Sequence, residues 1–191
     1  MSEIDNRERI LVAATHLFAH KGYGSTSVRE VVEAAGVTKP TLYYYFENKE
    51  ALFREVISWK MASGERVFSE AIAAGGTAVD VLRRVVTGLV DSARGDLDGL
   101  RLVMTCGLPM SDGQPRVDVM ERHLRNIAPL AALVEQGQAQ GQLRPEVDPT
   151  LAVVALLGTV NLQMMALLKG EPFSDDVIDA LIDTWLHGVS T

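Results

Sequence analysis

The sequence is poor in several features that define common protein classes. It has one cysteine among 191 residues, which excludes an intramolecular disulfide framework and any multi-cysteine zinc site. Long alternating apolar stretches bounded by Asn-Gly or Asp-Gly turns are missing, so strand signals are nearly absent. The first residues, MSEIDNRERI, are too polar and acidic for a secretory signal, and we expect a reducing, cytoplasmic location.

Positive charge is also scarce. The net charge is −7, from 18 Lys and Arg against 25 Asp and Glu, which argues against nucleic-acid binding through overall charge. Residues 1–55 carry seven cationic and eight anionic side chains, whereas residues 56–191 carry 11 and 17. Binding of a polyanion must therefore depend on a few locally placed cations and on helix ends.

Helical periodicity is present along the whole chain, and a hydrophobic content of 47% supports a packed core. Ile10, Ala14, Leu17 and Phe18 share one helix face, and Gly22 is expected to end that helix. We expect an all-α fold of about nine helices, of which the later ones cover roughly residues 28–35, 39–45, 48–74, 78–93, 97–106, 115–140, 149–169 and 175–188.

Two short helices near the N-terminus have well-marked ends. Ser27 and Glu30 fit a capping box at the start of the first, and Gly36 stands where a C-terminal glycine belongs. Thr38 can cap the second, and Pro40 is tolerated in its first turn. Two short helices joined by such a turn form a helix-turn-helix, whose second helix enters the major groove of DNA.

The second short helix presents polar and aromatic side chains on one face. Leu42 is expected to face inward, which turns outward Lys39, Thr41, Tyr43 and Tyr44. A phenol can donate to a phosphate, and a threonine can reach a base edge with its hydroxyl or methyl group. The alternative is a helical hairpin that uses its tyrosines for packing.

A family resemblance rests on these residues. Thr26–Ile57 resembles the DNA-binding domain of the tetracycline-repressor (TetR) family, and its segment AGVTKPTLYYYFENKEAL is close to the family's usual signature. Ala13–Gly24 resembles the family's first helix and loop. The resemblance implies a DNA-binding transcriptional regulator, not an enzyme. It implies an N-terminal three-helix helix-turn-helix domain in residues 1–50 and a larger helical ligand-binding and dimerisation domain in 51–191, linked by the helix at 48–74.

The resemblance also implies roles for individual side chains. The residues expected to bind DNA are Thr26, Ser27, Arg29, Thr38, Lys39, Pro40, Thr41, Tyr43, Tyr44 and Lys49. Lys49 would bind phosphate beside a helix N-terminus. Pro40 occupies a position that is often glycine in the family, a departure that stiffens the start of the helix.

The expected partners follow from the same resemblance. A homodimer would place two recognition helices about one DNA turn apart, roughly 34–36 Å, and would therefore bind double-stranded DNA at a near-palindromic operator. A small, largely apolar effector of unknown identity would release the repressor, with the helix at 48–74 as the lever between the domains. The resemblance implies no cofactor and no membrane partner.

The C-terminal part of the chain is strongly apolar. Leu151–Leu168 contains no charged residue. A membrane span needs about 20 apolar residues, but Thr159, Asn161 and Gln163 interrupt this segment. The favoured alternative is a helix buried on most sides, by the effector pocket on one side and by a dimer partner on another.

The last two helices of the family form a four-helix bundle across a two-fold axis. We therefore expect the dimer interface to contain Ala152, Ala155, Leu156, Thr159, Ile178, Leu181, Ile182 and Trp185. Burial in the core of the same chain is the alternative for some of these residues.

An effector pocket is expected among the middle helices, where methionine suits adaptable apolar surfaces. The candidates are Trp59, Met61, Met104, Cys106, Met110, Met120, His123, Leu124, Ile127, Asn161, Gln163, Met164 and Met165. The alternative for the methionines and for Cys106 is plain core, and for His123 a surface or hydrogen-bonded position.

Signals for other functions are weak. The chain has no His-Glu-x-x-His, Gly-x-Ser-x-Gly or phosphate-loop motif, which argues against the corresponding enzyme classes. His16 and His20 have the i, i+4 spacing of metal ligands, but the sequence shows no third ligand. A family-like protein that has lost DNA binding is a further alternative, against which the intact 39–49 segment argues.

Overall fold

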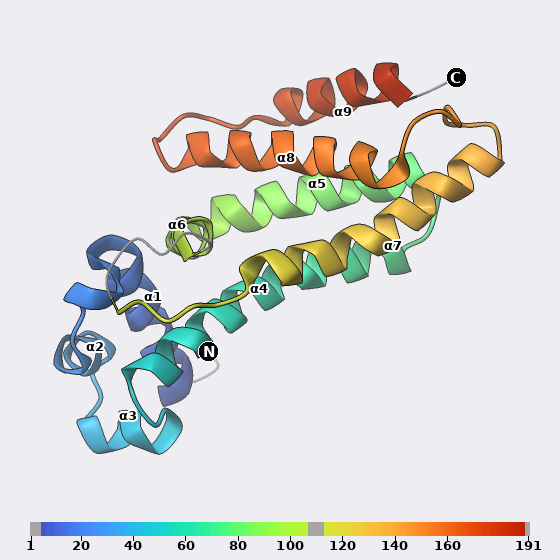
Figure 1. Cartoon of the computed structure of the whole chain (residues 1–191). Helices are drawn as coiled ribbons and strands as arrows, with labels where there is room; N and C mark the ends of the chain where they lie inside the picture. Colours follow the sequence, from blue (N-terminus) through green and yellow to red (C-terminus); the bar gives the residue numbers. More distant parts are fainter. Residues whose placement is uncertain (1–4, 107–112, 190–191) are drawn as a thin grey trace. The chain divides into compact units, whose positions relative to one another are not determined.

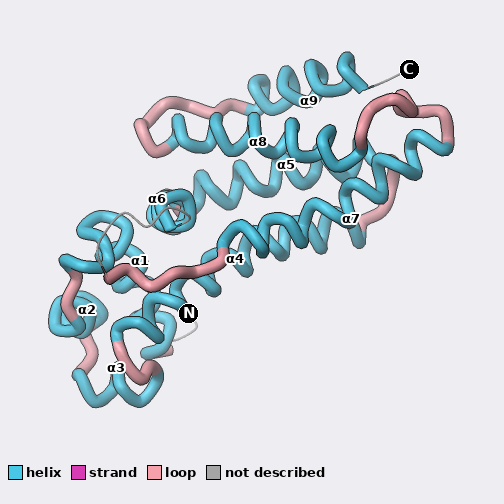
Figure 2. Tube along the Cα trace, in the orientation of Figure 1, coloured by secondary structure: helices cyan, strands magenta, loops and turns pink. Residues whose placement is uncertain are grey.

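The computed structural model describes residues 5–106 and 113–189 of the chain (Figure 1). These residues form nine α-helices and no strand, as Figure 2 shows by colour, which confirms the predicted all-α class. The helices are α1 (Asn6–Ser25), α2 (Val28–Ala35), α3 (Lys39–Tyr45), α4 (Lys49–Ala73), α5 (Ala78–Gly95), α6 (Leu97–Cys106), α7 (Val119–Ala139), α8 (Pro149–Leu167) and α9 (Asp175–Val189).

The described chain divides into two compact units. The first combines residues 5–62 with 98–106 and 113–119, and the second combines 63–97 with 120–189. Helix α4 begins in the first unit and ends in the second. The assignment of DNA binding to 1–50 and of ligand binding and dimerisation to 51–191 stays a prediction.

The first unit is built on one hydrophobic core. Helices α1, α2 and α3 pack on one another, and Ile10, Leu42 and Phe53 are almost fully buried among them. Leu102 and Cys106 of α6 belong to the same core. The middle and the end of α6 therefore pack in the same core as α1.

Helix ends follow the local signals in most places. The backbone leaves helical geometry at Gly22, with φ of 78° and ψ of 161°, and helical turns then continue to Ser25.

Helix α7, however, begins at Val119 and not near 115 as predicted. The carbonyl oxygen of Arg116 accepts a 2.8 Å hydrogen bond from Arg54 Nη1. An interaction with a distant side chain, invisible in local sequence, thus holds that segment outside the helix.

The second unit contains a helical layer of α5, α8 and α9, and Figure 1 shows α8 and α9 side by side. Asp148 caps α8 by accepting from the backbone N–H of Leu151 at 2.7 Å. Trp185 Nε1 on α9 donates to the carbonyl oxygen of Ala152 on α8 at 2.8 Å. By length and composition, α8 could cross a membrane, a test that core helices of soluble proteins also pass.

The structure corrects the predicted dimer interface. Four of the eight residues, each at most 4% exposed, lie in the core of the second unit: Ala152, Leu156, Ile178 and Ile182. They are already covered by their own chain and present no free surface to a partner. Ala155 and Thr159 are exposed, and Leu181 and Trp185 are half-buried, so their place in an interface stays a prediction.

The predicted pocket residues have varied surroundings. Met61 and Cys106 lie in the core of the first unit, against which Trp59 packs. Met120, Leu124 and Met165 are at least half exposed, and Met164 is buried in the second unit. The remaining candidates, partly buried, are Met104, His123, Ile127, Asn161 and Gln163. Met110 lies outside the described residues.

A cavity of about 260 Å³ occurs elsewhere in the second unit. It is lined by residues of the α4–α5 loop, the start of α5 and the end of α7, among them Thr77 and Gln140. None of the predicted pocket residues lines it, so the effector pocket stays a prediction.

Candidate nucleic-acid interface

Helix α2 begins at a complete capping box. Ser27 Oγ accepts from the backbone N–H of Glu30 at 3.3 Å, and the Glu30 carboxylate accepts from the backbone N–H of Ser27 at 2.8 Å. Lys21 forms an ion pair with the same carboxylate. The hydrogen bond from Lys21, with those from Ser27, lowers the pKa of Glu30 to about 2. The exposed Ser27 thus serves as the helix cap and lies at the surface where DNA contact was predicted.

The turn between α2 and α3 depends on glycine. Gly36 has φ of 62° and ψ of 38°, the left-handed conformation that residues with a side chain rarely adopt. Its carbonyl oxygen accepts from Arg9 Nη2 of α1 at 3.2 Å. A Cβ atom added at Gly36 would lie 2.7 Å from Arg9 Nη2. The backbone conformation therefore favours glycine here, whereas a Cβ atom would only displace the flexible end of Arg9.

Helix α3 is fixed at its start and by one core residue. Thr38 Oγ1 accepts from the backbone N–H of Thr41 at 3.3 Å and lies 2.8 Å from Thr41 Oγ1. Pro40 occupies the first turn, where its missing N–H costs no hydrogen bond. Leu42 is fully buried. The helix is thus held with one face against the core and the opposite face outward.

The outward face of α3 carries the predicted aromatic side chains. Tyr43 is 50% exposed and Tyr44 is 83% exposed, and Lys39 and Pro40 are exposed beside them. The ring of Tyr44 meets the half-buried Tyr45 edge-on, with centroids 4.9 Å apart. Exposed, neighbouring large aromatic side chains are typical of a surface that binds a partner.

Lys49 has a different environment from the one predicted. Its Nζ donates to the carbonyl oxygens of Tyr23 and Thr26 at 2.7 and 2.8 Å and lies 4.2 Å from the centroid of the Tyr23 ring. Desolvation by burial lowers its pKa. Two of the three ammonium donors therefore tie the start of α4 to the end of α1 and to Thr26. Phosphate binding by Lys49 stays a prediction.

The structure corrects the prediction for Thr26. Its side chain is 2% exposed, and its hydroxyl donates to the carbonyl oxygens of Gly22 and Leu17 at 2.9 and 3.3 Å. It therefore closes the end of α1 and presents nothing to a DNA backbone.

Arg29, by contrast, is exposed on α2 and pairs with Glu33 one turn later. Hydrogen bonding to Glu33 raises the pKa of Arg29, and this guanidinium is available near the surface.

Arg9 also belongs to this region, although it was not among the predicted residues. Its guanidinium bonds Gly36 O and also Asn6 Oδ1 at 3.2 Å, while the residue stays exposed. It places a positive charge beside the turn that precedes α3. No motif marks it, because its partner lies 27 residues away.

Two family models match the chain. The model for bacterial regulatory proteins of the tetR family matches residues 10–56. The model for the tetracyclin repressor-like C-terminal domain matches residues 72–185, more than half of the chain. The first match covers the capped α2–α3 pair described above, and the second covers most of the second compact unit.

Individual proteins give the same result. The HTH-type transcriptional regulator YdgC of Bacillus subtilis is 29% identical over 83% of this chain and 78% of its own length. The fatty acid metabolism regulator protein of the same organism is 27% identical over 80% and 78%. The solved structure of the fatty acid degradation regulator FadR from Bacillus halodurans has a TM-score of 0.78 and 22% identity, and covers 98% of each chain. This last likeness shows the fold.

Proposed function

The chain belongs to the TetR family of DNA-binding transcriptional regulators, and from this premise we propose that it is a cytoplasmic, homodimeric repressor. In this proposal it leaves a near-palindromic operator when a small, largely apolar effector binds. Regulators of the family bind DNA and small-molecule effectors and are dimeric.

The observation that carries the proposal is the exposed face of α3. A helix anchored by Leu42 and capped by Thr38 projects Lys39, Tyr43 and Tyr44 into solvent. A helix held in this way fits the major groove, with the phenols and the ammonium group toward phosphates. Thr41 is half-buried, and its hydroxyl would exchange its bond to Thr38 for a base edge.

A second surface supports the dimer. Helix α8 exposes a continuous apolar face, formed by Leu151, Val154, Ala155, Gly158, Leu162 and Met165. Val154 and Ala155 are adjacent and the other steps are three or four positions, so these residues share one side of the helix. Contiguous apolar surface of this kind marks association sites in soluble proteins. We propose this face, with Leu181 and Trp185 of α9, as the interface in place of the buried residues of the initial prediction.

The effector class follows from the named relative. A fatty acid metabolism regulator is 27% identical to the chain over 153 residues. We propose fatty acids or their acyl derivatives as the first effectors to test, because an alkyl chain suits methionine-rich apolar surfaces. By linkage, an effector that weakens DNA binding must itself bind the DNA-bound protein less tightly.

The operator is tested by selection of bound duplexes from a random pool. The expected result is a near-palindrome with half-sites about 10 base pairs apart or a multiple of that. Replacement of Thr41 by Ala should alter the preference at one symmetric pair of positions, while Val12→Ala, on the exposed side of α1, should not. If no duplex sequence is enriched at low or at moderate salt, sequence-specific binding is rejected.

The effector is tested on the complex with the selected operator. Acyl compounds of increasing chain length are titrated into the complex, and DNA release is followed by fluorescence anisotropy. We expect a release that strengthens with chain length, because each buried methylene contributes about 0.8 kcal/mol. Equal operator affinity with and without saturating compound would exclude that compound as an inducer.

A further inference from the structure

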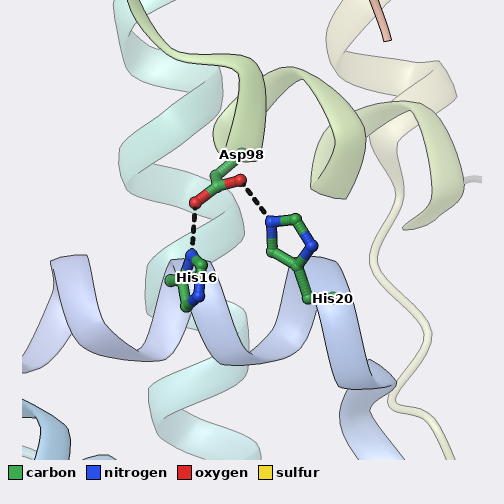
Figure 3. Close-up of side chains that lie close together, drawn as sticks. All are labelled: His16, His20 and Asp98. Carbon is green, nitrogen blue, oxygen red and sulfur yellow. Dashed lines mark hydrogen bonds and ion pairs between the residues drawn. The ribbon is translucent and has the colours of Figure 1, made fainter. Parts of the chain in front are cut away.

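Three side chains outside the face of α3 come together on the first compact unit. His16 and His20 lie one turn apart on α1, and Asp98 lies in the first turn of α6 (Figure 3). His16 Nδ1 is 2.8 Å from one carboxylate oxygen of Asp98, and His20 Nε2 is 2.7 Å from the other. Asp98 therefore supplies the third ligand that the sequence did not reveal for the two histidines.

The arrangement has the dimensions of a metal site. One ligand atom from each residue lies within 4.8 Å of the other two. Zinc binds imidazole nitrogen and carboxylate oxygen at about 2.0–2.2 Å, so that the ligand atoms of a tetrahedral site are roughly 3.3 Å apart. Each hydrogen-bonded N···O pair would need to separate by about 0.5 Å, and more widely spaced ligand atoms, which lie within 4.8 Å of one another, would need to approach, for the ion to fit.

The backbone that carries the three ligands is held by the core. Leu17 of α1 packs against the core that contains Leu102 and Cys106 of α6. The ligand side chains themselves are accessible, with exposed fractions of 63% for His16, 43% for His20 and 33% for Asp98. An ion can therefore reach the site without opening the core, and rotation of surface side chains completes its shell.

We propose that His16, His20 and Asp98 form a binding site for a borderline divalent transition metal such as Zn²⁺, Ni²⁺ or Co²⁺. Two imidazoles and one carboxylate favour these ions, whereas Mg²⁺ and Ca²⁺ prefer a shell of oxygen atoms. Three protein ligands leave at least one position for water. The bound ion links α1 of the helix-turn-helix to α6, and metal binding is measured without DNA, so its outcome is independent of the proposed repressor function.

The site is tested on the untagged full-length chain after treatment with chelator. Co²⁺ is titrated while its visible absorption is recorded, and Zn²⁺ binding is followed by calorimetry. We expect saturable binding with one ion per chain. The melting temperature should rise by about 5 °C when free Zn²⁺ is a hundredfold above its Kd, and Mg²⁺ should have no effect.

Variants identify the ligands. His20→Ala, His16→Ala and Asp98→Asn should each weaken Co²⁺ binding at least about tenfold. His187→Ala is the matched control, because His187 is exposed on α9 and its ring lies against the Asp183 carbonyl oxygen. Melting in the presence of chelator verifies that each variant is folded, and three ligand variants guard against the failure of any one.

The results distinguish a metal-binding site from a simple hydrogen-bonded contact. Loss of binding in the folded ligand variants with retention in His187→Ala supports the site. Absence of one-to-one Co²⁺ binding, or binding that survives all three ligand replacements, would overturn the proposal. The cluster would then be only a hydrogen-bonded contact between α1 and α6.

Discussion

Helices α3 and α8 both present a surface that we assign to binding, but the chain marks the two surfaces differently. In α3, one buried leucine and a row of polar or aromatic residues divide seven positions into an inner and an outer side. In α8, the 19 residues are apolar nearly all round. The pattern of α3 therefore sets its orientation, whereas that of α8 leaves its orientation to tertiary packing.

This difference explains where the predicted interface was wrong. Leu156 is as apolar as Leu151 and Leu162, and Ala152 is apolar too, so no feature of the sequence tells which pair faces inward. The packing of α5 and α9 against α8 decides it, and it buries the first pair while Leu151 and Leu162 stay 64% and 66% exposed. Amphipathic helices reveal their inner face in the sequence, and uniformly apolar helices do not.

The largest expected effect comes from a charge on the exposed face of α8. Leu162→Glu would place two carboxylates in the proposed two-fold interface, where desolvation of each ion costs several kcal/mol. We expect a monomer in sedimentation experiments. Operator affinity should fall at least about 100-fold, because joining two half-site contacts in one dimer raises the binding affinity by a factor of about 10²–10⁴.

Leu124→Glu is the control for the oligomeric state, since Leu124 is a comparably exposed leucine on α7 of the same unit. It should sediment as the parent chain does. A dimer that persists in Leu162→Glu, or one that is lost equally in Leu124→Glu, would show that α8 does not form the interface.

The same contrast describes how far the sequence predicts the nucleic-acid interface. The Ser27 and Thr38 caps, the left-handed Gly36 and the inward Leu42 follow from local rules and are present in the structure. The predicted DNA contact of Thr26 was wrong, because its side chain is buried and its hydroxyl donates to the carbonyl oxygen of Gly22. The main-chain partners of Lys49 were not predicted either. Contacts between segments far apart in sequence leave no periodic signal.

A second prediction separates the two lysines of this region. Lys49→Ala removes the ammonium donor from the carbonyl oxygens of Thr26 and Tyr23, of which Tyr23 keeps the backbone N–H of Thr26. We therefore expect a loss of about 1–3 kcal/mol in the free energy of unfolding. Lys39→Ala should keep stability within about 0.5 kcal/mol, because Lys39 is exposed. It should instead lower the salt dependence of operator binding by about one unit of slope.

Denaturant unfolding and binding at several salt concentrations measure both effects. If Lys49→Ala keeps full stability and alone lowers the salt slope, Lys49 contacts phosphate in the complex and its loop contacts are secondary. If Lys39→Ala leaves the slope unchanged, the ammonium group of α3 lies away from the DNA backbone.

The smallest expected effect compares two capping boxes, at Glu30 on α2 and at Asp80 on α5. Hydrogen bonds from Lys21 and Ser27 lower the pKa of Glu30 to about 2, and hydrogen bonds from Thr77 lower the pKa of Asp80. A carboxyl whose pKa is lower in the folded state contributes stability above its unfolded pKa. For Glu30 this contribution is lost as the pH falls from about 4.3 through the folded value.

Glu30→Gln should therefore flatten the dependence of melting temperature on pH between about pH 4.5 and pH 2. Asp80→Asn should flatten it less, because among the described residues the hydrogen bonds to Asp80 come from Thr77, and no cation bonds it as Lys21 bonds Glu30. Thermal scans across this range decide the order. If both variants change the pH dependence of the melting temperature equally, the capping hydrogen bonds alone set the pKa values of Glu30 and Asp80. The Lys21 ion pair would then not stabilise the start of α2, on which the position of α3 depends.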